Sequence, residues 1–178
     1  MKVFLIAGKS QTGKGEIAQR IKNYYNKKNQ KSIITEYSKY IKLFAKEMTS
    51  WDGQEIKKPR KFLQDMGYFI RSNLNMPNFF ISRMKEDIKI YEHFFDNIII
   101  SDVRYPEEIN QIKKEYSNVY AIQVTRNYKN NLKKEEQEHE SEHALENYKN
   151  FDFIIENDQI DELNKKINEI LENINENN

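Results

Sequence analysis

Residues 3–15 read VFLIAGKSQTGKG, an apolar run followed directly by a glycine-rich turn. The spacing Gly8-x-x-x-x-Gly13-Lys14 is that of a phosphate-binding loop, whose glycines let successive backbone N–H groups turn toward phosphate oxygens. A segment with helical spacing follows, and its positive N-terminal end favours an anion at the same point. Lys14 is expected to reach the β- and γ-phosphates of a nucleotide. The alternative, a strand-to-helix turn with an incidental lysine, is disfavoured because strand, loop and helix follow in the order that the motif requires.

One position departs from the usual form of this loop. Gly15, followed by Glu16, stands where a serine or threonine is expected. Glycine has no hydroxyl to offer a Mg²⁺ ion. The metal would therefore be held by water, by another side chain or by the nucleotide alone.

Five short apolar runs, rich in β-branched or aromatic residues, are expected to form strands. They are Val3–Ala7, Ser32–Tyr37, Asn97–Ser101, Val119–Thr125 and Phe151–Glu156. Longer segments with helical spacing lie between them, and this alternation predicts an α/β fold with a five-stranded parallel sheet. Residues 38–96 are too many for one crossover helix, so they are expected to hold three helices. Residues 127–143 are almost wholly polar and are open to two interpretations, a solvated helix-loop or a mobile lid.

Length and composition exclude several classes of protein. The 178 residues suit a single domain, residues 1–178, with a core of its own. The 29 Lys and Arg are balanced by 28 Asp and Glu, so a stable nucleic-acid partner is not expected. The chain has no cysteine, which excludes disulfides and thiolate chemistry. No apolar run is long enough for a membrane span, so a cytoplasmic protein without a membrane partner is expected, and a homodimer is left open.

The third apolar run, Asn97–Ser101, leads directly into the sequence Asp102-Val103-Arg104-Tyr105-Pro106. Ligands of open α/β sheets bind beyond the carboxyl ends of the strands. Asp102 therefore suits the carboxylate that orients Mg²⁺ and its waters, and Arg104 could neutralise phosphate charge. The alternative is that Asp102 caps a helix beginning near Pro106.

Three residues of the long insertion share one face if the segment is helical. Arg60, Gln64 and Arg71 are separated by four and seven residues. Such a row could bind a phosphate and a base edge, or it could be a solvated helix face, and the sequence favours neither. Between them, Phe62, Leu63, Met66 and Phe69–Ile70 are expected to form the opposite, core-facing stripe.

Candidate residues also occur near the polar stretch. Arg126 closes the fourth strand, where a cation could stabilise a transferring phosphoryl group or simply be solvated. His139 and Glu142 are open to a role as an acid–base or metal pair, although composition favours exposed residues at a helix entrance.

Taken in order, these motifs resemble the P-loop deoxynucleoside monophosphate kinases of the phage and bacterial type. The resemblance rests on the loop, the segment 60–71, the Asp102–Glu108 motif, Arg126, the His139-x-Ser141-Glu142 pattern and the final FIIEND stretch at residues 153–158. It implies a three-layer P-loop kinase fold, ATP as donor, Mg²⁺, a substrate-binding insertion at residues 38–96 and a lid at residues 127–143.

The resemblance also implies a role for each matching residue. The expected catalytic residues are Lys14, Asp102, Arg104 and Arg126, with Asp102 toward the metal. ATP would be bound by Gly8, Ser10, Gln11, Thr12, Gly13, Lys14, Gly15, Glu16, Arg126, Asn157 and Asp158. The acceptor would be bound by Ser38, Arg60, Gln64, Arg71, Arg104, His139 and Glu142. Two other functions stay open, a P-loop kinase of another small phosphate acceptor (phosphomevalonate-like or dephospho-coenzyme A-like) and a non-catalytic nucleotide-binding module.

Overall fold

The computed structural model describes residues 1–127, 132–158 and 160–176. Within these ranges, five parallel strands form one sheet in the order β2-β3-β1-β4-β5. The strands are β1 (Lys2–Ala7), β2 (Ser32–Thr35), β3 (Asn97–Val103), β4 (Val119–Thr125) and β5 (Phe153–Glu156). The predicted α/β fold is confirmed, although β2 and β5 are shorter than expected.

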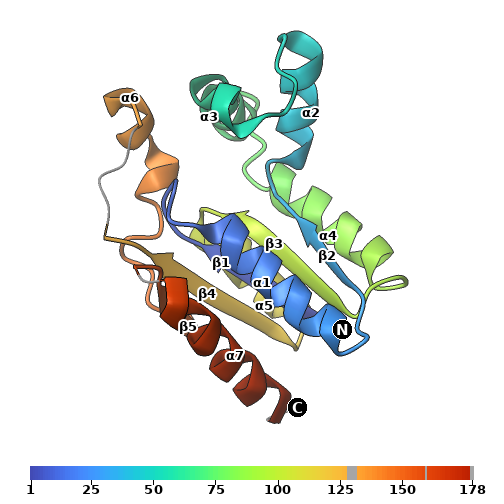
Figure 1. Ribbon diagram of the computed structural model, residues 1–178. Coiled ribbons are helices and arrows are strands. Elements are labelled where there is room, and N and C mark those ends of the chain that lie inside the picture. Colours follow the sequence, from blue (N-terminus) through green and yellow to red (C-terminus); the bar gives the residue numbers. More distant parts are fainter. Residues whose placement is uncertain (128–131, 159, 177–178) are drawn as a thin grey trace.

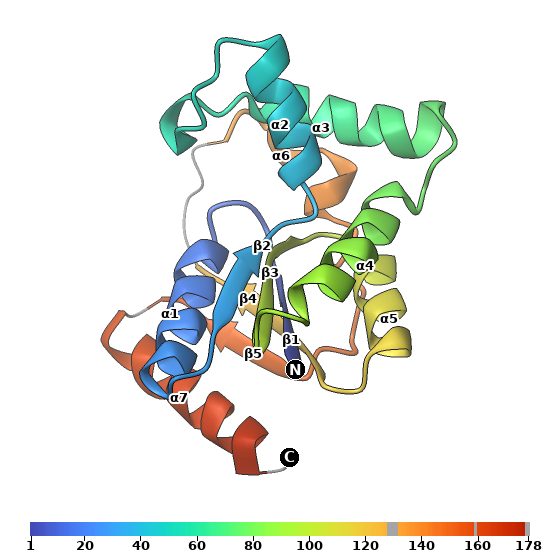
Figure 2. The ribbon, with the colours of Figure 1, turned by 90° about the vertical axis from the view of Figure 1, so that its right-hand side faces the viewer.

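Helices cover both faces of the sheet, and the alternation of side chains along β1 shows why (Figures 1 and 2). Val3, Leu5 and Ala7 are fully buried against α4 (Phe79–Tyr91) and α5 (Pro106–Glu115). Phe4 and Ile6 point to the other face and pack with α1 (Lys14–Lys27) and α7 (Ile160–Glu176). Because the central strand is apolar on both faces, each face requires its own helical layer.

The segment between β2 and β3 is helical, as predicted. It contains α2 (Lys39–Met48), the 3₁₀ turn η1 (Glu55–Lys57), α3 (Arg60–Tyr68), the π-turn η2 (Phe69–Asn73) and α4. Figure 1 shows α2 and α3 rising above one end of the sheet. The expected core stripe is wrong at Phe69, which is 51% exposed, because the π-turn that begins there breaks the 3.6-residue spacing.

The polar stretch after β4 lies above the same end of the sheet, opposite α2 and α3 (Figure 1). Its described part contains α6 (Lys134–Gln137) and the 3₁₀ turn η3 (Glu140–Glu142). Residues 128–131 of the predicted lid lie outside the described residues. In the part of the chain described, no helix is both long and apolar enough to span a bilayer.

Candidate active site

The loop between β1 and α1 requires glycine at two positions. Gly8 has φ +148°, and a Cβ there would lie 2.4 Å from the carbonyl oxygen of Val124. Gly13 has φ +94°, and a Cβ there would lie 2.1 Å from Nδ2 of Asn157. The two glycines therefore allow the tight, left-handed path of the loop against its neighbours.

Lys14 opens α1 and folds back over the loop. Its Nζ donates hydrogen bonds to the carbonyl oxygens of Gly8 (2.8 Å) and Lys9 (2.7 Å). Burial and the nearby charge of Arg104 hold the pKa of Lys14 well below its ordinary value, against the opposing effects of Glu142 and Asp102. The ammonium is half-buried and has only backbone carbonyl oxygens as hydrogen-bond acceptors, so the negative charge of a phosphate would stabilise it further.

Gly15 adopts an ordinary backbone conformation. It lies within α1, its φ is not positive, and a Cβ there would meet nothing within 4 Å beyond the backbone of its own helix. The missing hydroxyl is therefore not forced by the backbone.

Asp102 lies at the end of β3 and binds the turn between β2 and α2. Its Oδ1 accepts a hydrogen bond from the backbone N–H of Tyr37 (2.7 Å), and its Oδ2 accepts from both N–H (3.0 Å) and Oγ (2.6 Å) of Ser38. The alternative of a helix cap is wrong, because α5 begins at Pro106 and Glu108 accepts the N–H groups at its start. These bonds bring Asp102 and the Ser38 hydroxyl side by side.

Glu142 joins the loop to Arg104. Its Oε2 accepts a hydrogen bond from the backbone N–H of Ser10 (2.7 Å), and its Oε1 lies 2.9 Å from Nη1 of Arg104. Arg104 and Glu142 are close enough for an ion pair, but their geometry is not that of a hydrogen bond. The buried Nη1 of Arg104 can therefore still donate a hydrogen bond to a ligand. The expectation that Glu142 is exposed is wrong, because its side chain is 6% exposed.

The row on α3 and η2 faces the same space. Arg60 Nη1 donates to Ser10 Oγ (3.3 Å), and Gln64 Nε2 donates to the carbonyl oxygen of Glu136 in the polar stretch (3.1 Å). Arg71 lies deeper, with Nη2 3.6 Å from Oε1 of Glu108. The row is thus not a solvated face, since it connects the insertion to the loop and to the polar stretch after β4.

These residues surround one pocket of about 400 Å³ at the carboxyl edge of the sheet. It is lined by the predicted residues Ser10, Gln11, Gly13, Lys14, Gly15, Ser38, Arg60, Gln64, Arg71, Asp102, Arg104, His139 and Glu142. His139 accepts the N–H of Ser141 at Nδ1 (3.2 Å), and burial lowers the pKa of its ring, which favours neutral imidazole.

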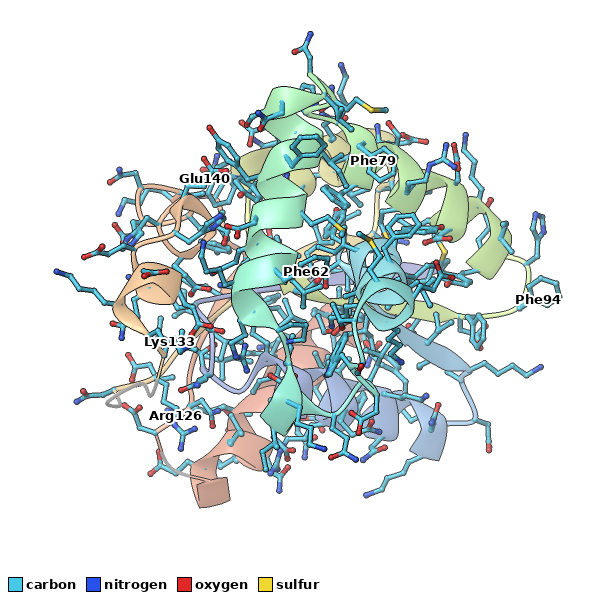
Figure 3. The ribbon with its side chains drawn as sticks, turned by 90° about the horizontal axis from the view of Figure 1, so that it is seen from above. Phe62, Phe79, Phe94, Arg126, Lys133 and Glu140 are labelled. Atoms are coloured by element: carbon cyan, nitrogen blue, oxygen red, sulfur yellow. The ribbon has the colours of Figure 1, made fainter. Side chains whose placement is uncertain are left out.

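Other predicted residues lie outside the pocket lining. Asn157 is buried and donates from Nδ2 to the carbonyl oxygen of Thr12 (2.8 Å), so it braces the loop. Asp158 accepts the N–H of Asn127 (2.7 Å), and Glu16 pairs with Arg20 along α1. Arg126 is exposed, and Figure 3 shows it toward the edge of the molecule, apart from Glu140.

The sequence interpretation missed several lining residues. They are Glu36, Tyr37, Ile41, Lys42, Glu55, Lys58, Leu63, Gly67, Phe80, Ser101, Tyr105, Glu108, Leu132, Glu136 and Ser141. Glu108 could have been found from the sequence. A glutamate at the third position of a helix often accepts the backbone N–H of the residue that caps the helix, and Glu108 has this position relative to Tyr105 and the helix that begins at Pro106. Lys58 carried no such signal, and in the structure burial and the nearby charge of Lys42 lower its pKa, against the opposing effect of Glu55.

A glycine-rich loop before a helix, together with a half-buried lysine and two arginines at the carboxyl edge of a parallel sheet, defines a P-loop nucleotide-binding protein. The sequence matches the family described as deoxynucleotide monophosphate kinase over residues 14–167. The chain belongs to this family, and it is a nucleotide monophosphate kinase that carries out ATP-dependent phosphoryl transfer.

The chain was also compared with solved structures and with curated protein sequences. Among solved structures, one match is a mutant of the APS kinase CysC of Mycobacterium tuberculosis, with 12% identity, a TM-score of 0.47 and 96% of each chain covered. No curated protein sequence matches the chain.

Proposed function

We propose that the pocket transfers the γ-phosphoryl group of ATP to the phosphate of a deoxynucleoside monophosphate, giving ADP and the diphosphate. The observation that supports this most strongly is that Lys14, Arg104 and Arg71, from three different parts of the fold, line one pocket. Phosphoryl transfer needs little covalent help from a protein, but it needs positioning and neutralisation of charge.

The loop end of the pocket suits the donor. The N–H groups after Gly8 and the start of α1 would bind the β- and γ-phosphates, with Lys14 leaving its carbonyl partners to pair with them. Asn157 would act by holding the loop in shape rather than by contacting adenine. Arg126 and the lid remain proposed contacts of the transferring group.

The opposite end suits the acceptor. Arg71 and Arg104 carry planar guanidinium groups that bind phosphate oxygens in pairs. Glu108 contacts both residues, because its Oε1 lies 3.6 Å from Nη2 of Arg71 and its Oε2 accepts the backbone N–H of Arg104 (2.7 Å). Ser38, Arg60, Gln64, His139 and Glu142 are proposed to complete the acceptor site from the pocket walls.

Asp102 and Ser38 could bind a Mg²⁺ ion that enters the pocket together with the nucleotide. Among the described residues, no group of three or more His, Asp or Glu could hold a metal by itself. Mg²⁺ commonly keeps several waters and takes one or two carboxylates plus substrate phosphates. The Asp102 carboxylate accepts one hydrogen bond at Oδ1 and two at Oδ2, which leaves an acceptor site at Oδ1, and the Ser38 hydroxyl beside it offers the oxygen that Gly15 lacks. Bound there, Mg²⁺ would neutralise phosphate charge.

The experiment is an ADP-release assay of the purified chain with ATP, Mg²⁺ and each ribo- and deoxyribonucleoside monophosphate in turn. Phosphomevalonate and dephospho-coenzyme A serve as comparison acceptors. ADP release that depends on a deoxynucleoside monophosphate supports the proposal. Release only with a comparison acceptor would favour the other kinase function, and ATP binding without release would favour a non-catalytic module. Because charged nucleotides do not cross membranes, we expect the enzyme to act in the cytoplasm.

A further inference from the structure

Two aromatic rings and a carboxylate surround the guanidinium of Arg71. Its guanidinium carbon lies 4.5 Å from the ring centre of Phe80 and 4.3 Å from the ring centre of Tyr105. Glu108 Oε1 is 3.6 Å from its Nη2. The three partners come from α4, from the turn before α5 and from α5, whereas Arg71 comes from the π-turn η2.

The space around this guanidinium is shaped to fit it. A Cβ at Gly67 would lie 3.1 Å from Nη1 of Arg71, so the absence of a side chain at Gly67 makes room for the group. Phe80 is 2% exposed and Glu108 is buried, so two walls of the space are rigid parts of the core. Tyr105 is only partly buried, and its ring forms the wall that faces the lid.

Tyr105 also contacts the lid directly. Its hydroxyl donates a hydrogen bond to Oε1 of Glu140 in η3 (2.9 Å). Figure 3 shows Glu140 beside the helix formed by α3 and η2, on the lid side of the molecule. The ring of Tyr105 is therefore positioned between Arg71 and the lid.

A guanidinium binds a phosphate in a bidentate manner only when its plane is correctly oriented. Stacking on an aromatic ring fixes that plane and adds a cation–π attraction. We propose that Tyr105 is a positioning residue, whose ring sets the orientation of Arg71 for the acceptor phosphate. The inference rests on the proposed role of Arg71 in acceptor binding and adds to it a second residue that acts through Arg71.

The test is a double-mutant cycle between Tyr105 and Arg71. Calorimetric Kd values for dAMP, dCMP, dGMP and dTMP, and for ATP, are measured for the parent, Tyr105→Leu, Arg71→Ala and the double variant. Tyr105→Leu should raise the acceptor Kd on the order of tenfold, the range of a partly buried cation–π contact, and leave the ATP Kd within about twofold. In the Arg71→Ala background, the same change should have less than about a twofold effect.

Two further variants separate the ring from other roles. Tyr105→Phe keeps the ring and should keep the acceptor Kd within about twofold of the parent, although it loses the bond to Glu140. Tyr68→Leu is the matched control, because Tyr68 is an exposed tyrosine of α3 outside the pocket lining, and it should change neither Kd. If Tyr105→Leu does not fold, Tyr105→Met takes its place in the cycle.

The outcomes distinguish this inference from the proposed function. If Arg71→Ala leaves the acceptor Kd unchanged, both the role of Arg71 and the inference are overturned. If Arg71→Ala weakens acceptor binding but Tyr105→Leu does not, only the inference is overturned. If the two effects multiply in the double variant, Tyr105 acts independently of Arg71, and the positioning role is again overturned.

Discussion

The Glu142 carboxylate accepts the backbone N–H of Ser10 at 2.7 Å, so a residue of the polar stretch after β4 places negative charge on the phosphate-binding loop. The same carboxylate lies 2.9 Å from Arg104. A donor phosphate bound at the loop would use the Ser10 N–H, and an acceptor phosphate would use Arg104. Glu142 therefore competes with the phosphates of both substrates for these partners.

This competition makes Glu142→Gln informative, because glutamine keeps the size and the acceptor oxygen but removes the charge. ATP should bind more tightly to the variant, on the order of fivefold, since repulsion between the carboxylate and the phosphates is lost. Glu146→Gln is the matched control, because Glu146 pairs with Lys9 and His143 on the surface. Calorimetric Kd values for ATP give the comparison, and weaker binding to Glu142→Gln would contradict it.

Lys14→Ala tests the donor end of the pocket. Loss of a preorganised charge next to the phosphates commonly costs about 2.7–4 kcal/mol of transition-state stabilisation, so kcat should fall about 10²–10³-fold. Lys9→Ala is the control, because Lys9 lies in the same loop but its side chain is 55% exposed. Steady-state rates of both variants are compared with the parent, and an unchanged rate for Lys14→Ala would exclude the assigned role.

Asp102→Asn and Gly15→Ser test the metal from opposite directions. The asparagine removes the charge offered to Mg²⁺ and should shift half-maximal activity to higher Mg²⁺ concentration, while ATP binding without metal changes little. The serine restores a hydroxyl at a position with open space and should shift the curve to lower Mg²⁺. Activity against Mg²⁺ concentration is measured for all three proteins. If Asp102→Asn follows the parent curve, the carboxylate serves only the turn at Tyr37 and Ser38.

Glu108 predicts a pH dependence of stability. Burial raises its pKa to about 7, helped by Asp102, while Arg71 and the N–H groups of Arg104 and Tyr105 oppose the shift. The folded protein therefore holds the Glu108 proton more tightly than the unfolded chain does. The protonated carboxyl adds to the free energy of unfolding at pH 4–5, and this contribution is lost as pH rises through about 7. The side chain of Glu108→Gln cannot ionise. The difference in free energy of unfolding, variant minus parent, should therefore increase by on the order of 1–3 kcal/mol between pH 5 and pH 8.

Urea unfolding of both proteins at pH 5, 6, 7 and 8 measures this difference. Because the other titrating groups, including Tyr37 next to the Glu108 backbone, are shared, they cancel in the comparison. A difference that stays constant with pH, or shrinks as pH rises, would show that Glu108 is already ionised at pH 5.

The sheet and the loop were predictable because their signals are local. Apolar runs such as Ile98–Ile100 and the glycine spacing before Lys14 carry their structure within a few residues. The burial of Glu142 was not predictable, since a glutamate in a polar run is usually solvated, and only the fold brings it to the Ser10 N–H. The surroundings of Arg71 were not predictable either, because Tyr105 is distant in sequence and the π-turn that carries Arg71 had no signal in the sequence.

The central claim is that donor and acceptor phosphates meet in one pocket, between the Gly8–Lys14 loop and the Arg71–Arg104 pair. A bisubstrate analogue, adenosine and a deoxynucleoside joined 5′ to 5′ through five phosphates, tests it most directly by calorimetric Kd. Because its halves are linked, it should bind at least about 100-fold more tightly than ATP, and both Lys14→Ala and Arg71→Ala should weaken it. An analogue that binds no more tightly than ATP would contradict the account.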